Sequence, residues 1–200
     1  MTLIPVNLAT EDELSEVILL RVLADLNRYA VGTAYRRGGS GYLRRTIHGW
    51  NSAAKGVPFI VLTDLDAAEC PARLVNEWLQ TQAHPNLLFR IAVREVESWL
   101  LADPANLSEF LGVKMVAPTI TDAIADPKAA IIDLARKSRS RTIRDRIVPR
   151  KGSTAKHGPD YNGCLGWFVR KRWDIDTAKT NSPSLARTLD RLTSFNPVWY

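Results

Sequence analysis

The clearest hydrophobic pattern in the chain is a short apolar run that ends in acidic residues. Residues 58–62 are apolar, and Thr63, Asp64, Leu65 and Asp66 follow them. A run this short, rich in β-branched and aromatic residues, is typical of a buried strand. Pro71 suits the first turn of a helix over residues 72–82. That helix would carry an apolar stripe of Leu74, Val75, Trp78 and Leu79.

Similar patterns place further strands and helices along the chain. Residues 2–8 and 87–93 are expected to be strands, and helical spacing of apolar residues follows the first of them, with Thr10 as the expected N-cap. Later segments begin with a capping residue followed by proline, at Asp103, Asp126 and Ser182. The chain is therefore predicted to be an α/β protein with a mostly parallel sheet flanked by helices. Residues 1–103 would form the core, and residues 104–200 a helical, basic portion packed on it in one compact domain.

Acidic residues follow each of the three predicted strands. They are Glu11, Asp64, Asp66, Glu95 and Glu97. In extended backbone, Asp64 and Asp66 leave the same side of the chain. The carboxyl ends of parallel strands meet at one edge of a sheet, where ligands bind. On a helix, Glu95 and Glu97 would point apart, so one of them is expected in the site, and the sequence leaves open which. The alternative is that these acids have no role in a site and occur here because negative charge is stabilising at a helix N-terminus.

Crowded carboxylates repel one another unless a cation neutralises them. Their oxygens suit Mg²⁺ or Mn²⁺, which can lower the pKa of water and orient a phosphate. Lys128, Lys151 and His157 are candidates for a general acid or a charge clamp, and their spacing selects none of them. Cys70 and Cys164 match no zinc-ligand spacing. An Asp-x-Asp pair also occurs in some phosphatases and sugar-nucleotide transferases, so a small-molecule phosphatase is a further hypothesis.

The segment around residues 35–45 combines glycine, arginine and tyrosine. Glycines allow a backbone to approach phosphate closely, and arginines bind phosphate in bidentate fashion. The expected substrate contacts are Arg36, Arg37, Gly39, Gly41, Arg44, Lys151 and His157. The segment matches neither the Walker nor the dinucleotide pattern. A solvated turn with ordinary surface arginines is the alternative.

Charge is unevenly distributed along the chain. Its 27 Lys and Arg residues outnumber 21 Asp and Glu residues, and the net charge is +6. Much of the excess lies in a basic run over residues 136–156, followed by more cations near residues 170–172. A dense cationic face suits a nucleic-acid backbone, although a solvated surface is the simpler explanation. No apolar stretch is long enough to span a bilayer and no secretory signal is evident, so a cytoplasmic protein is expected.

Several segments together resemble a known family. They are residues 11–16, 38–41, 62–66, 90–103, 126–128 and 158–162, of which the Arg-Ile-Ala-Val-Arg-Glu-Val-Glu-Ser-Trp-Leu-Leu-Ala-Asp block is the most specific. The order of a strand ending in Glu and a strand ending in Asp-x-Asp resembles the TOPRIM domain of topoisomerases, primases and overcoming-lysogenization-defect nucleases. Over most of its length the chain resembles the TOPRIM-like DUF4276 family.

The resemblance implies a TOPRIM-like fold and a Mg²⁺ ion held by Glu11, Asp64 and Asp66, with Glu95 or Glu97 joining them. TOPRIM domains often carry glycine after the first glutamate, where this chain has Asp12, so Glu13 is an alternative to Glu11. The resemblance also implies an AAA or SMC-like ATPase partner in an anti-phage system. Nucleic acid and further copies of the chain are the other expected partners, without a membrane.

The leading hypothesis is a metal-dependent nuclease acting on DNA or RNA. Its site would use Glu11, Asp64, Asp66 and Glu97, with Glu95 as the alternative to Glu97 and Lys128 as a further catalytic candidate. The alternative is a TOPRIM-like subunit that binds nucleic acid or an ATPase and does not cut.

Overall fold

Four parallel strands form the sheet of this protein, for which a computed structural model describes residues 2–36, 38–115 and 120–199. The strands are β1 (Ile4–Thr10), β2 (Tyr29–Tyr35), β3 (Phe59–Asp64) and β4 (Leu87–Ala92). Their order in the sheet is β2-β1-β3-β4, and every pair is parallel. The predicted α/β class, with a parallel sheet and a helical second half, is confirmed.

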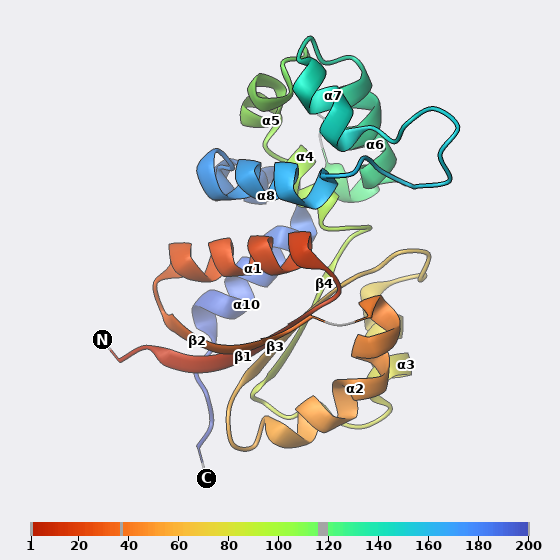
Figure 1. Cartoon of the computed structure of the whole chain (residues 1–200). Helices are drawn as coiled ribbons and strands as arrows, with labels where there is room; N and C mark the ends of the chain where they lie inside the picture. The colour runs from red at the N-terminus through yellow and green to blue at the C-terminus, as the bar shows by residue number, and fades with distance from the viewer. Residues whose placement is uncertain (1, 37, 116–119, 200) are drawn as a thin grey trace.

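Helices cover both faces of the sheet (Figure 1). One face packs against α1 (Glu13–Leu26) and α10 (Pro183–Ser194), and the other against α2 (Gly39–Ala53) and α3 (Pro71–Leu79). Adjacent strand residues divide between the two layers, because side chains alternate along a strand. Ile60 and Leu62 join the first core, whereas Phe59 and Val61 join the second.

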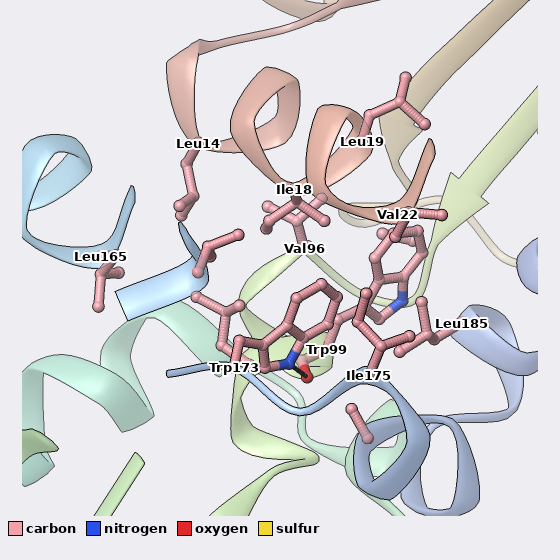
Figure 2. Close-up of a cluster of buried hydrophobic side chains, with 14 of the residues drawn as sticks. Leu14, Ile18, Leu19, Val22, Val96, Trp99, Leu165, Trp173, Ile175 and Leu185 are labelled. Carbon is pink, nitrogen blue, oxygen red and sulfur yellow. Dashed lines mark hydrogen bonds between the residues drawn. The ribbon is translucent and has the colours of Figure 1, made fainter. Parts of the chain in front are cut away.

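The second half of the chain extends the layer that contains α1. Its helices are α4 (Glu97–Leu101), α5 (Pro104–Leu111), η1 (Thr121–Ala123), α6 (Pro127–Arg136), α7 (Arg141–Ile147), α8 (Tyr161–Lys171) and α9 (Ile175–Asn181). Figure 2 shows Trp99 and Trp173 below α1, where the Trp173 indole N–H donates to the Trp99 carbonyl at 3.1 Å. Both indoles are fully buried, so this part shares a hydrophobic core with the sheet.

The predicted helix starts in this half are confirmed. The side chains of Asp103, Asp126 and Ser182 accept hydrogen bonds from backbone N–H groups in the first turn of α5, α6 and α10. Each helix has proline in its first turn, where the missing N–H leaves no hydrogen bond unmade. These signals are local, so they could be recognised without the tertiary structure.

The first half differs from the prediction in three places. Residues 29–35 form an edge strand that sequence reasoning missed, because most of them are exposed and show no alternation. Much of the glycine–arginine segment around residues 35–45 forms the start of α2, which begins at Gly39 after Gly38 with a φ of 72°. The N-cap of α1 is Asp12, not Thr10, because the Asp12 carboxylate accepts from Ser15 N–H at 2.9 Å.

The connections that follow neighbouring strands diverge at the carboxyl edge of the sheet. The neighbours β1 and β3 are followed by α1 and α3, which lie on opposite faces. The chain therefore diverges between their carboxyl ends, at the topological switch point where open α/β sheets bind ligands. Glu11 follows β1 and Asp64 ends β3, so both acids lie at this switch point.

Among the described residues, no helix has the length and apolar character needed to cross a membrane.

Removing the cap of α6 is expected to weaken the fold modestly. The Asp126 carboxylate accepts from Ala129 N–H at 2.7 Å, and α6 carries Lys128 in its first turn. Asp126→Ala should lower the free energy of unfolding by about 1 kcal/mol, the usual cost of a lost N-cap. Urea denaturation measures this loss. Asp133→Ala on the same helix, which removes only an exposed ion pair with Arg136, should cost less than about 0.5 kcal/mol; equal losses would contradict the capping role.

Candidate active site

Glu11 and Asp64 meet directly at the carboxyl edge of the sheet. Glu11 Oε1 accepts a hydrogen bond from the Asp64 backbone N–H at 2.9 Å and another from the Thr63 hydroxyl. Thr63 is buried in β3 and follows Leu62, which pairs with Thr10 at the end of β1. The two acids therefore come together because their strands are neighbours in the sheet, although 53 positions separate them in the chain.

Asp64 also holds the segment that carries the two glutamates. Asp64 Oδ1 accepts from the Val96 N–H at 2.9 Å. The backbone N–H groups of Leu65 and Asp66 donate to the Arg94 carbonyl at 2.9 and 3.0 Å. These bonds fix residues 94–96 against the end of β3. The last turn before α4 therefore lies at the same edge as Glu11.

Glu97 is the most deeply buried of the acids. Only 1% of its surface is exposed. Its Oε1 accepts from the Tyr161 hydroxyl at 3.1 Å, and the Lys128 ammonium lies 3.4 Å from the same oxygen. Its Oε2 is buried and has no hydrogen-bond partner among the described residues. A buried carboxylate oxygen without a partner is costly, so this atom requires a physical explanation.

Lys128 lies between the two glutamates that the sequence could not separate. Its backbone N–H donates to Glu95 Oε2 at 2.9 Å, at the start of α6. Its ammonium is 3.8 Å from Glu95 Oε1 and 3.4 Å from Glu97 Oε1. Glu95 and Glu97 thus both face Lys128. They differ in burial, because Glu95 keeps partial access to solvent and Glu97 does not.

The protein environment opposes the charged form of the acids. Burial raises the pKa of Glu11, against the hydrogen bonds from Thr63 and the Asp64 backbone, and the charge of Asp66 raises it further. Burial raises the pKa of Asp64 well above its ordinary value, and the charges of Glu97 and Glu11 add to this. Burial raises the pKa of Glu97 to about 7, although Lys128 acts in the opposite direction. The acids therefore form one electrostatically coupled group.

The environment favours the charged form of Lys128. Burial tends to lower the pKa of its ammonium, but the carboxylates of Glu97, Glu95 and Asp64 together raise it above its ordinary value. Lys128 is therefore a fixed positive charge at neutral pH rather than a base. It offsets part of the negative charge of the group.

Asp66 does not share the geometry of Asp64. The expectation that both side chains leave the same side of an extended chain is wrong, because β3 ends at Asp64 and Asp66 has a φ of 49°. Asp66 is exposed, and its side chain makes no hydrogen bond to the described residues. Its charge still raises the pKa of Glu11, so it lies within electrostatic reach of the group.

The predicted substrate-binding residues are dispersed around this edge. Arg36 pairs with Glu16 at 3.1 Å and with Glu13 at 3.6 Å, at the start of α1. Glu13, the alternative metal ligand, is thus engaged by Arg36. Gly39 and Gly41 lie in the first turn of α2, and Arg44 is exposed one turn later. Arg37 falls outside the described residues.

The other two predicted contacts lie between α7 and α8, in a segment that projects from the molecule (Figure 1). Lys151 is exposed there. The His157 ring lies 4.9 Å from the ring of Tyr161, which in turn donates to Glu97. Tyr161 therefore lies between His157 and the buried carboxylate of Glu97. No contact joins Lys151 to the acids within the described ranges.

Sequence reasoning missed Tyr161 and Thr63 as members of the site. Tyr161 is 1% exposed, and burial raises the pKa of its hydroxyl well above the ordinary value, with Glu97 adding to the shift. Its hydroxyl is therefore a permanent donor to Glu97. A tyrosine at the start of a helix carries no sequence signal for this role, since its partner is 64 positions away.

Comparisons with known proteins give no further guidance. No protein-family model matches the chain, and neither the curated proteins nor the solved structures yield a match. Over residues 2–36, 38–115 and 120–199, no three His, Cys, Asp or Glu side chains are arranged as a ready-made metal site.

Proposed function

We propose that this protein is a Mg²⁺- or Mn²⁺-dependent phosphodiesterase that acts on DNA or RNA. The observation that carries the proposal is the buried, unpartnered Oε2 of Glu97, a residue within electrostatic reach of Asp64, which contacts Glu11. A divalent cation would give that oxygen a partner and relieve the repulsion that raises the pKa of these acids.

The residues present fit such a cation. Hydrogen bonds occupy Glu11 Oε1 and Asp64 Oδ1, and within the described residues the second oxygen of each makes none. Glu11, Asp64 and Glu97 would hold the ion, with Asp66 or Glu95, whose charges act on Glu11 and Glu97, as a further ligand. All are oxygen donors, the chemistry that Mg²⁺ and Mn²⁺ prefer. When bound, the cation supplies positive charge to a phosphodiester and lowers the pKa of water.

The protein's own groups have separate parts in this proposal. Asp64 and Glu11 fix the end of β3 to that of β1, so the carboxylates are held before a substrate arrives. Lys128 keeps a positive charge against Glu95 and Glu97, and Tyr161 orients Glu97. Such preorganisation reduces the reorganisation needed when charge develops on a phosphate.

The wider biological role follows from the resemblance to TOPRIM-like proteins rather than from the site. It supports a role as the effector of an anti-phage system beside an AAA or SMC-like ATPase. The excess of positive charge in the chain is compatible with a polyanionic substrate.

Metal binding and cleavage by the wild-type protein test the proposal. At an Mn²⁺ concentration of about 100 times Kd, stability should increase by about 2.7 kcal/mol, which raises the melting temperature by several degrees. An equal ionic strength of NaCl should not reproduce this rise. Plasmid DNA or a long RNA should be cut with Mn²⁺ or Mg²⁺ and not with EDTA. Hydrolysis of an aryl phosphate monoester without cleavage of either polymer would instead favour a phosphatase.

A further inference from the structure

A cationic groove lies between α5 and the connection from α6 to α7. Its volume is about 680 Å³. Ser108, Glu109 and Gly112 line it from α5 and its C-cap, and Lys137 and Arg139 line it from the connection. Val113, Lys114 and Ser140 complete the lining. The groove is separate from the acidic group, since the two share no lining residue.

The positive charge of this groove is not cancelled by neighbouring acids. Lys114, Lys137 and Arg139 form no ion pair with any residue that the structure describes. The acid of the groove, Glu109, is itself paired with Arg172 at 2.6 Å. The groove therefore offers three cations to a ligand, together with the hydroxyl group of Ser140, which accepts from the Ile143 N–H and keeps its own hydrogen to donate.

Other members of the basic run are already engaged. Arg136 pairs with Asp133, Arg141 with Asp145, and Arg146 with Asp160. These arginines have partners that a ligand would have to displace, whereas Lys137 and Arg139 do not. The structure thus separates these three paired arginines from Lys137 and Arg139, which line the groove and remain available to an anion.

Helix α6 connects the groove to the acidic group. Lys128 is in its first turn, beside Glu95 and Glu97, and Lys137 is its C-cap. The interval of nine residues corresponds to about 14 Å along the helix axis.

We propose that this groove binds the phosphate backbone of the nucleic-acid strand that the acidic group would cleave. The cleavage of that strand rests on the proposed function, whereas binding in the groove does not. Lysine, arginine and serine are the side chains that commonly contact phosphate oxygens, and such contacts position a strand without reading its sequence. The substrate inferred here is therefore a polymer rather than a mononucleotide.

A double variant, Lys137→Gln/Arg139→Gln, tests the groove. Binding to a fluorescent 20-nucleotide single strand is measured in EDTA over a series of salt concentrations. The variant should bind on the order of tenfold more weakly. The slope of log K against log salt should become shallower by about 1.5, because roughly two phosphate contacts are lost. The matched control is Lys55→Gln/Lys179→Gln, two lysines outside the groove, which should leave the slope unchanged.

Activity then separates the two proposals. With Mn²⁺, the groove variant should hydrolyse a bis-aryl phosphodiester like the wild type but cleave the oligonucleotide more slowly. An unchanged salt slope and affinity in the groove variant, with the fold verified by circular dichroism, would overturn the groove proposal whatever the activity. If the wild type cleaves neither substrate while the groove variant still loses binding, the proposed function fails and the groove stands as a binding surface.

Discussion

Asp64→Asn is expected to lower metal-dependent cleavage by on the order of a thousandfold. The substitution removes one of the carboxylates proposed to hold the cation, and the lost electrostatic stabilisation of the transition state, about 4 kcal/mol, corresponds to that factor. Asparagine keeps an Oδ1 that can accept from the Val96 N–H, so the segment carrying Glu95 and Glu97 should stay in place. Rates are measured on plasmid or oligonucleotide at saturating Mn²⁺.

The same substitution should leave the metal-free protein at least as stable as the wild type. Burial and the charges of Glu97 and Glu11 raise the pKa of Asp64 well above its ordinary value, so the native state disfavours its charged form. A neutral amide removes that cost at pH 7. Asp190→Asn, on the exposed surface of α10, is the matched control and should retain full activity. Full activity of a well-folded Asp64→Asn protein would eliminate the proposed phosphodiesterase site.

Lys128→Met is expected to destabilise the metal-free protein by about 2–3 kcal/mol at pH 8.5. The lysine offsets the charge of Glu97, whose side chain is 1% exposed, and removing one partner of a buried pair leaves the other uncompensated. The partial exposure of Lys128 and Glu95 reduces the loss below that of a fully buried pair. Denaturant titrations in EDTA measure the difference.

The loss should be smaller at pH 5.5. The pKa of Glu97 is raised from 4.5 to about 7 in the folded protein, so the native state holds a proton that the unfolded chain releases. Its contribution to stability is present below about pH 4.5 and is lost as the pH rises through about 7. Without Lys128, the pKa of Glu97 rises further, and the cost of charging it extends to higher pH.

Two variants complete this experiment. Glu97→Gln combined with Lys128→Met should recover most of the stability at pH 8.5, because no buried charge is then left unpaired. Lys179→Met breaks an exposed pair with Asp176 and should cost less than about 0.5 kcal/mol at either pH. A cost of Lys128→Met that equals that of Lys179→Met, or that does not change with pH, would refute the electrostatic role of Lys128.

Local signals explain why parts of the architecture could be predicted. The apolar run that ends at Asp64 has the composition of a buried strand. The helices that start after Asp103, Asp126 and Ser182 can be recognised in the sequence by a capping residue followed by proline. Edge strand β2 lacks such a signal, because its small, exposed residues do not alternate. The glycine-rich sequence at the start of α2 is typical of a loop, because glycine destabilises a helix interior. In the structure these glycines lie in the first turn, where glycine is tolerated.

The site was predictable only in part. Acids at the ends of β1 and β3 must approach one another once those strands are neighbours, and Glu11 does contact Asp64. The position of Asp66 was not predictable from its two-residue spacing, because the strand stops at Asp64 and the backbone turns. The metal, the substrate and the relationship to TOPRIM-like proteins remain predictions.

The sequence by itself determined the α/β class, the main helix starts and the acids at the strand ends, because caps, prolines and apolar runs act over a few residues. Only the tertiary structure decided which glutamate is buried and what surrounds it. Lys128 and Tyr161 reach Glu97 from α6 and α8, and Tyr161 is 64 positions away in the chain. Contacts of this kind depend on how the helices pack over the sheet, and the burial that raises the pKa of Glu97 exists only once they have done so.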